Sequence, residues 1–157
     1  MTYVLERADL VPSPRDEVFE FFSDPRNLGR ITPESMGFRI THMDGLPIRP
    51  DFRVEYTIRP LLGITVKWVT RISIFEPPHR FVDIQEKGPY KYWRHEHSFE
   101  DMGDRTLMRD RVQYELPFGI LGSVAHGIVV ARQLKGIFDY RARKIASIFA
   151  PSKTIAG

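Results

Sequence analysis

The sequence has 157 residues, with 23 basic and 20 acidic side chains, a net charge of +3 and no cysteine. This length suits one domain and leaves too little chain for two independent cores. Basic and acidic residues are interspersed, so the charge gives no support to nucleic-acid binding. The absence of cysteine excludes a disulfide framework and a thiolate metal site.

The N-terminal segment argues against export. Glu6, Arg7 and Asp9 interrupt the apolar run that a secretory signal requires. No apolar stretch approaches the roughly 18 residues of a membrane-spanning helix. We therefore expect a cytoplasmic protein without integral membrane association. Residues 1–150 are expected to form a single domain, and residues 151–157 a C-terminal tail.

The chain begins with a predicted strand and two short helices. Thr2–Val11 has a strand-like pattern, and Ser13 and Pro14 then supply an N-cap and a first residue for a helix over Pro14–Ser23. A second short helix follows through Leu28–Ile31 and ends before a proline. These helices separate the first strand from the strands that follow.

Six further strand candidates are separated by turns rich in glycine, proline and aspartate. The turns are short enough to join neighbouring strands as hairpins, which predicts a sequential antiparallel meander. The six candidates are Gly37–His42, Asp51–Arg59, Ile64–Phe75, Arg80–Glu86, Tyr90–Glu100 and Arg105–Leu116.

The last third of the chain changes to a helical period. From about residue 120 to Pro151, apolar residues recur at spacings of three and four, which predicts one long amphipathic helix. The opposite face carries mostly charged residues. The apolar positions are Val124, Ile128, Ala131, Leu134, Phe138, Ala142, Ile145 and Phe149.

These elements predict an α+β fold in which the sheet curves. A seven-stranded antiparallel sheet has two faces, and one long helix covers only one of them. The sheet must therefore wrap around the C-terminal helix, with the two short helices between the first and second strands. This arrangement leaves space between sheet and helix where a ligand can lie.

Strand alternation assigns the side chains that face this cavity, because residues two apart share a face. On two strands the apolar set lies opposite charged residues such as Arg53, Lys67 and Arg71, so the apolar set is expected to point inward. The expected inward residues are Phe52, Val54, Tyr56 and Ile58 on one strand and Val66, Trp68, Thr70, Ile72 and Ile74 on the next.

The next strands add polar groups to the predicted lining. On the strand over Tyr90–Glu100, the charged residues Arg94 and Glu96 lie on one face, so the four residues of the other face are expected to point inward. On the last strand, the apolar set carries one carboxylate inward with it. These two sets are Trp93, His95, His97 and Phe99, and Met108, Asp110, Val112 and Tyr114.

The register between these strands depends on the turn over residues 101–104. A four-residue turn with Glu100 opposite Arg105 places His97 opposite Met108 and His95 opposite Asp110. A carboxylate and an imidazole would then meet inside the cavity.

The orientation of the strand before them is ambiguous, because its two faces are similar. Phe81 and Asp83 share one face, and Val82 and Ile84 share the other. If Phe81 points in, either Phe81 or Asp83 neighbours His95. The polar group in the cavity would then comprise Asp83, His95, His97 and Asp110.

Several segments of this sequence resemble a known superfamily over nearly the whole chain. They are Phe81-x-Asp83-x-Gln85, Gly88-Pro89-Tyr90, Trp93-x-His95-x-His97-x-Phe99 and Asp110-x-Val112-x-Tyr114 followed by Leu116-Pro117-Phe118-Gly119, together with Val11-Pro12, Val18-Phe19 and Ile137-Phe138-x-Tyr140-Arg141. The pattern is similar to a bacterial branch of the START/Bet v 1-like (SRPBCC) superfamily, whose members are described as ligand-binding or polyketide cyclase/dehydrase-like. The resemblance implies a helix-grip fold and a hydrophobic ligand cavity. It transfers no catalytic residue, because fold does not fix function.

Three functions remain open at this stage. The first is binding or carriage of a small, largely apolar ligand, aromatic, polyketide-like or lipid-like. The second is a cyclase, dehydrase or hydrolase that uses His95 with Asp110, assisted by His97 or Tyr114. The third is a protein-interaction module without a physiological ligand. The oligomeric state is left open between a monomer and a weak dimer.

The ligand-contacting residues expected for the first function are the cavity-facing ones, each of which could equally be ordinary core. They are Tyr56, Trp68, Thr70, Asp83, Trp93, His95, His97, Met108, Asp110, Val112 and Tyr114.

The two histidines also raise the question of a metal. His95 and His97 present both imidazoles to one side of a strand, as in zinc and iron sites, and Asp110 could add a carboxylate. No further residue lies at metal-ligand spacing. We therefore expect neither a metal nor a cofactor, and we expect these side chains to be hydrogen-bonded polar groups of the pocket.

Overall fold

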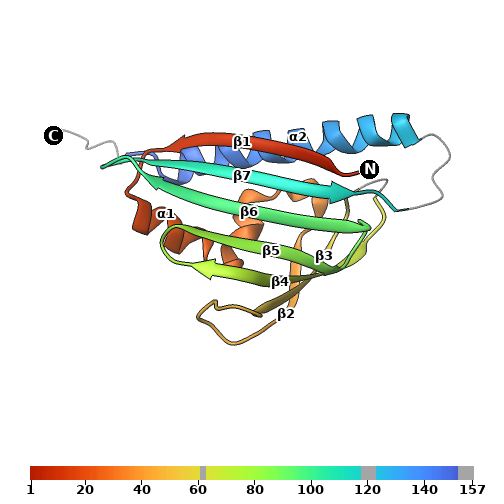
Figure 1. Cartoon of the computed structure of the whole chain (residues 1–157), viewed down its shortest axis with the longest axis horizontal. Coiled ribbons are helices and arrows are strands. Elements are labelled where there is room, and N and C mark those ends of the chain that lie inside the picture. The colour runs from red at the N-terminus through yellow and green to blue at the C-terminus, as the bar shows by residue number, and fades with distance from the viewer. Residues whose placement is uncertain (61–62, 118–122, 152–157) are drawn as a thin grey trace.

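The computed structural model describes residues 1–60, 63–117 and 123–151 (Figure 1). Its seven strands form one antiparallel sheet in the order β1-β7-β6-β5-β4-β3-β2, so the predicted meander is confirmed. Every strand begins and ends within two residues of its predicted limits. The strands are β1 (Tyr3–Val11), β2 (Arg39–Met43), β3 (Arg53–Ile58), β4 (Val66–Glu76), β5 (Arg80–Lys87), β6 (Tyr92–Asp101) and β7 (Thr106–Glu115).

The predicted helices lie in their expected places, although the second short one is a 3-10 helix. A further 3-10 helix over Glu34–Met36 was not predicted. The predicted start of the long helix near residue 120 and the tail beyond residue 151 lie outside the described residues. The helices are α1 (Arg15–Phe22), η1 (Pro25–Ile31), η2 (Glu34–Met36) and α2 (Ser123–Ile148).

The start of α1 differs from the prediction. Pro14 occupies the N-cap position, and no side chain caps the helix. The Ser13 hydroxyl instead donates a 2.7 Å hydrogen bond to the carboxylate of Glu17. Proline tolerates this position because the missing N–H would have no partner there.

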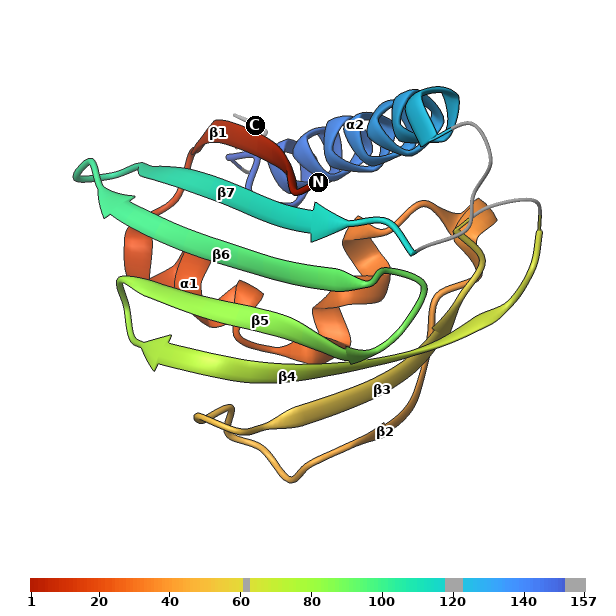
Figure 2. The ribbon, with the colours of Figure 1, turned by 45° about the vertical axis from the view of Figure 1, so that its right-hand side comes forward.

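The sheet curves around the helices. Figures 1 and 2 show α1 and η1 on the concave side of the sheet, while α2 runs along the edge formed by β1 and β7. The Phe138 ring of α2 lies 5.6 Å from the imidazole of His95 on β6, so the helix reaches the middle of the sheet. This is the predicted architecture, with the long helix held by the curved sheet.

Burial and one ion pair fix α2 to the sheet. Leu134, Phe138 and Ile145 are buried on one face of the helix. Arg7 of β1 forms a salt bridge with Asp139 on α2. None of the helices in the described part of the chain combines the length and apolar character needed to cross a bilayer.

A bulge in β4 changes which residues face inward. Ile72 pairs with Asp83, whereas Ile74 pairs with Val82 and Phe75 pairs with Phe81. The extra residue at the bulge shifts the alternation by one. Phe75 packs against the buried core in place of Ile74, so the expected inward orientation of Ile74 is wrong.

Phe19 of α1 is the centre of an aromatic cluster at one end of the core. Its ring lies 5.2 Å from Phe99, 5.7 Å from Phe75 and 6.0 Å from Phe81. These rings come from β6, β4 and β5, so α1 is fixed to three strands at once. Edge-to-face pairs of this kind add to the free energy gained by burying the rings.

We predict that Phe19→Ala lowers the free energy of unfolding by about 3 to 5 kcal/mol, because it removes a buried ring and leaves a cavity. Leu10→Ala is the control, because Leu10 is 50% exposed, and it should cost less than about 1 kcal/mol. Urea denaturation of both variants measures the difference. Equal costs would mean that α1 is not held by this cluster.

Candidate functional site

A cavity of about 180 Å³ lies between the concave face of the sheet and the helices. Most of its wall is apolar, from Phe22 and Leu28 on one side to Ile58 and Ile72 on the sheet. Of the residues predicted to contact a ligand, seven line this cavity: Tyr56, Trp68, Thr70, Asp83, Trp93, His95 and His97.

The other predicted contact residues lie outside the lining. Met108, Asp110, Val112 and Tyr114 all come from β7 and are at most 3% exposed. For Val112 and Tyr114 the reason is the position of α2, which runs along the β1 and β7 edge and packs on them. Met108 is buried in the other core cluster, which joins residues of α1 to Ile145 of α2. These β7 residues form the layer behind the cavity wall.

The register of β6 and β7 differs by two residues from the prediction. Asp101 pairs with Thr106, so His97 lies opposite Asp110 and His95 lies opposite Val112. The expected pairing of Glu100 with Arg105 is therefore wrong, because the four residues between the strands are 102–105 rather than 101–104. A shift of two keeps every side chain on its predicted face. The histidines and Asp110 consequently still meet.

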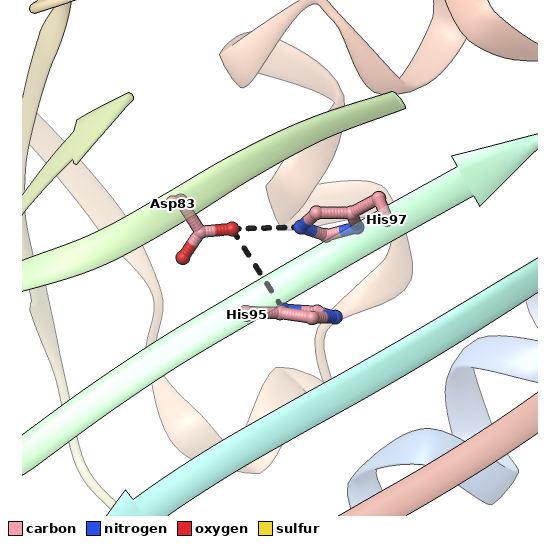
Figure 3. A group of neighbouring side chains, drawn as sticks. All are labelled: Asp83, His95 and His97. Carbon is pink, nitrogen blue, oxygen red and sulfur yellow. Dashed lines mark hydrogen bonds and ion pairs between the residues drawn. The ribbon is translucent and has the colours of Figure 1, made fainter. Parts of the chain in front are cut away.

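The ambiguity of β5 is also resolved. Asp83 pairs with His95, and Phe81 pairs with His97. Both side chains point to the concave face. Figure 3 shows Asp83 reaching from β5 toward the two imidazoles of β6. A second carboxylate thus joins the histidines from the opposite side to Asp110.

The two histidines and two aspartates form a buried quartet. His97 Nε2 lies 2.7 Å from Asp83 Oδ2 and His95 Nε2 lies 2.8 Å from Asp110 Oδ1, both within hydrogen-bond distance. His95 Nδ1 is 3.8 Å from Asp83 Oδ2. His97 Nδ1 approaches Asp110 Oδ1 to 3.3 Å but makes no hydrogen bond among the described residues. Each imidazole therefore lies between two carboxylates.

The quartet holds its two imidazoles in different charge states. Burial and the neighbouring His97 together lower the pKa of His95 to about 4, against the opposing effect of the carboxylates. Burial also opposes the charge on His97, but its contacts with Asp110 and Asp83 outweigh that effect and raise its pKa. The pair titrates as a coupled unit, with the first proton on His97.

Both carboxylates stay ionised in spite of burial. For Asp110, the charge of Arg141, the hydrogen bond from His95 and the nearby His97 hold the pKa well below its usual value. For Asp83, the hydrogen bond from His97 has the same effect on the pKa. The charge of Arg141 and the raised pKa of His97 both favour these two negative charges.

These charge states give His95 a defined tautomer. A carboxylate only accepts hydrogen bonds, so the Nε2 of His95 carries the proton donated to Asp110. The Nδ1 of a neutral His95 is then an acceptor on the side of Asp83. His95 can receive a hydrogen bond from a ligand hydroxyl, and Asp110 fixes its orientation.

Arg141 lies in a segment that carries the family resemblance, but the sequence analysis did not place it in the cavity. It is 8% exposed, lines the cavity, and lies over the rings of Phe22 and Phe138. A signal for it exists in the sequence. Arg141 continues the spacing of Leu134, Phe138 and Ile145, which places a charge on the apolar face of an amphipathic helix.

Comparison with solved structures identifies the same fold in several proteins. A START superfamily protein from Mycobacterium smegmatis matches with a TM-score of 0.70 and 12% identity over 93% of this chain and 96% of its own. The Zhui aromatase/cyclase from Streptomyces sp. R1128 matches with a TM-score of 0.66 and 13% identity, over 94% and 90%. Norcoclaurine synthase from Thalictrum flavum gives 0.66 and 12%, over 94% and 96%.

The chain therefore has the START-like helix-grip fold that its sequence motifs predicted. No protein-family model matches the sequence, and no curated protein matches it significantly. At identities this low, the likeness establishes fold alone.

The cluster contains three atoms of metal-ligand type, from Asp83, His95 and His97, all within 4.8 Å of one another. The third donor is thus Asp83, where the sequence analysis had considered Asp110. The two imidazoles lie with centroids 3.7 Å apart and planes tilted by 32°. His97 Nε2 and His95 Nδ1 lie 2.7 and 3.8 Å from Asp83 Oδ2, so the carboxylate itself occupies the point on which the ligands of a metal would converge.

We predict that the purified protein contains no stoichiometric zinc or iron. Elemental analysis of the protein, before and after dialysis against a chelator, tests this. One metal per chain in the wild type, absent from a His95→Ala/His97→Ala variant, would contradict the prediction.

The pKa of His95 also predicts a pH dependence of stability. His95 takes up a proton near pH 6.5 in the unfolded chain but only near pH 4 in the folded chain. The unfolded state binds more protons in this window, so acidification from pH 6.5 toward 4 lowers the free energy of unfolding. The pKa of His97 is raised, so its contribution changes only above this window.

Chemical denaturation across this pH range measures the effect. We expect the stability of the wild type to fall with acidification relative to His95→Gln, which lacks the titrating group. His42→Gln is the control, because His42 is exposed on β2, and it should follow the wild type. Parallel profiles for wild type and His95→Gln would show that His95 is not held neutral by the fold.

Proposed function

We propose that the chain binds a small, largely apolar molecule, such as an aromatic, polyketide-like or lipid-like compound, in the cavity beneath α2. The observation that carries the proposal is an apolar cavity with a few fixed polar groups in its wall. Sites for small molecules have this composition, because apolar area supplies affinity and the polar groups set orientation.

Aromatic side chains form one wall of the cavity. Trp68 and Trp93 meet edge to face with centroids 5.3 Å apart, and Tyr56 stacks on Trp68 at 5.8 Å. Tyr90 lies 4.8 Å from Trp93. Flat rigid side chains of this kind suit a flat or extended apolar ligand. Each 100 Å² of apolar ligand surface buried here contributes about 2.5 kcal/mol.

The polar groups lie together on the sheet side of the cavity. Asp83, His95 and His97 line it, whereas Asp110 supports the imidazoles from behind. A ligand would therefore direct a polar end toward the quartet and an apolar body toward the tryptophans. Asp110 acts through His95 rather than by touching the ligand.

An enzyme of the cyclase or dehydrase type is the second candidate. The hydrogen bond between His95 and Asp110 favours it, because a carboxylate that orients an imidazole is a common acid/base arrangement. The lowered pKa of His95 makes it a weak base, which favours binding over catalysis. Mass spectrometry separates the two candidates, because a binding protein releases its ligand with an unchanged mass.

A protein-interaction module is the third candidate, and the cavity weighs against it. A fold used only through its surface needs no internal space, since filled cores are more stable. Failure of the chain to bind any apolar compound would favour this reading.

Titration with the neutral fluorescent probe N-phenylnaphthylamine tests the binding proposal. We predict that the wild type binds the probe and that Trp68→Ala or Trp93→Ala weakens binding about tenfold, because each removes apolar contact area. Asp110→Asn keeps the shape of the site and should change probe affinity less than either tryptophan variant.

Tyr92→Ala is the matched control for Trp93→Ala. Tyr92 precedes Trp93 on β6 but points outward and is 41% exposed, so its loss should leave probe affinity unchanged. If the wild type binds no apolar probe, or if all variants bind alike, the cavity is not the functional site.

A further inference from the structure

Arg141 places a positive charge inside a mainly apolar cavity. Its guanidinium carbon lies 5.0 Å from the centre of the Phe22 ring and 5.5 Å from that of Phe138. The residue is 8% exposed. These contacts hold the planar group in place from two sides. They supply no hydrogen-bond acceptor.

The guanidinium nitrogens lack the partners that burial normally requires. Nε and Nη2 of Arg141 are buried and make no hydrogen bond with any described residue. The guanidinium also forms no ion pair within the described ranges. An unpaired buried charged donor costs free energy that a bound acceptor would recover.

The two free nitrogens form one edge of the guanidinium, and that edge has a preferred partner. Two N–H groups side by side match the two oxygens of a carboxylate. The same chain uses this edge elsewhere. Arg53 Nε and Nη2 bind the two oxygens of Glu86 at 2.9 and 3.1 Å, and Arg80 binds Glu76 at 2.7 and 3.1 Å.

The two aspartates of the quartet do not bind this edge of the guanidinium. Asp83 and Asp110 direct oxygens to His97 and His95 at 2.7 and 2.8 Å. Their attraction to Arg141 acts from beyond ion-pair distance. The other unpartnered cavity atoms, Trp68 Nε1 and His97 Nδ1, are also nitrogens. The cavity thus offers hydrogen-bond donors that have no partner among the described residues, and a ligand with hydrogen-bond acceptors would satisfy them.

We propose that the cavity selects ligands that carry a carboxylate, which Arg141 binds through both Nε and Nη2. This inference rests on the proposed binding function and adds the chemical class of the ligand. The apolar body of the ligand extends from Arg141 toward Tyr56 and Trp68. Arg141 is the residue that distinguishes an acid from a neutral molecule of the same shape.

Calorimetric titration with decanoic acid and decanol at neutral pH tests the proposal. The two probes share an apolar chain, so their difference in affinity reports the polar end alone. We expect the wild type to bind decanoic acid at least about tenfold more tightly than decanol, the range of a charge-assisted bidentate contact. Arg141→Gln should lower the affinity for decanoic acid to about that for decanol, and it should change the affinity for decanol by less than it changes that for the acid.

Two further variants complete the design. Arg141→Lys keeps the charge but loses the two-nitrogen edge, so the preference should shrink without vanishing. This variant also serves if Arg141→Gln does not fold. Arg143→Gln, an exposed position on the same helix, removes an equal charge outside the cavity and should behave as the wild type.

The outcomes separate this inference from the proposed function. If N-phenylnaphthylamine binds but decanoic acid shows no advantage over decanol, the carboxylate proposal fails and the binding function stands. A preference for the acid that survives Arg141→Gln and Arg141→Lys also overturns the proposal. If neither the probe nor either decane derivative binds, both proposals are wrong.

Discussion

The site depends on the charge balance of a buried quartet. Asp83 and Asp110 are ionised within the fold, which is tolerable only because His95, His97 and Arg141 surround them. The quartet joins β5, β6 and β7 across the sheet, and Arg141 ties it to α2. Loss of either aspartate or of Arg141 leaves the opposite charges unbalanced. The same balance fixes the protonation of His95 and places polar groups at the cavity wall.

The sequence predicts which face of the sheet a side chain occupies better than it predicts which residues pair between neighbouring strands. Alternation correctly placed His95, His97 and Asp110 together, because an error of two residues in the turn after β6 changes partners but not faces. The bulge in β4 shifted the alternation by one, which no periodicity reveals, and Ile74 was misplaced for that reason. The residues that line the cavity were harder still to predict, since they depend on where α2 lies. Because α2 packs on Tyr114, this side chain is buried behind the cavity wall.

Because proteins of different chemistry share this fold, the polar residues of the cavity wall say more about function than the fold does. An aromatase/cyclase and norcoclaurine synthase have the same helix-grip fold, so sheet and helix alone do not determine chemistry. In this chain, the distinguishing features are the two adjacent imidazoles, the two aspartates and the guanidinium edge of Arg141, which has no hydrogen-bond partner among the described residues. Together they suit a ligand with one polar end and an apolar body. The apolar wall supplies area for that body.

Native mass spectrometry of the chain with N-phenylnaphthylamine tests the central claim most directly. The comparison is with Thr70→Trp, which places a large side chain in the cavity, since Thr70 lines it. The account predicts a one-to-one complex for the wild type and none for the variant, with both proteins folded by circular dichroism. A wild type that forms no complex, or a variant that forms it equally well, would contradict the claim that the cavity is the binding site.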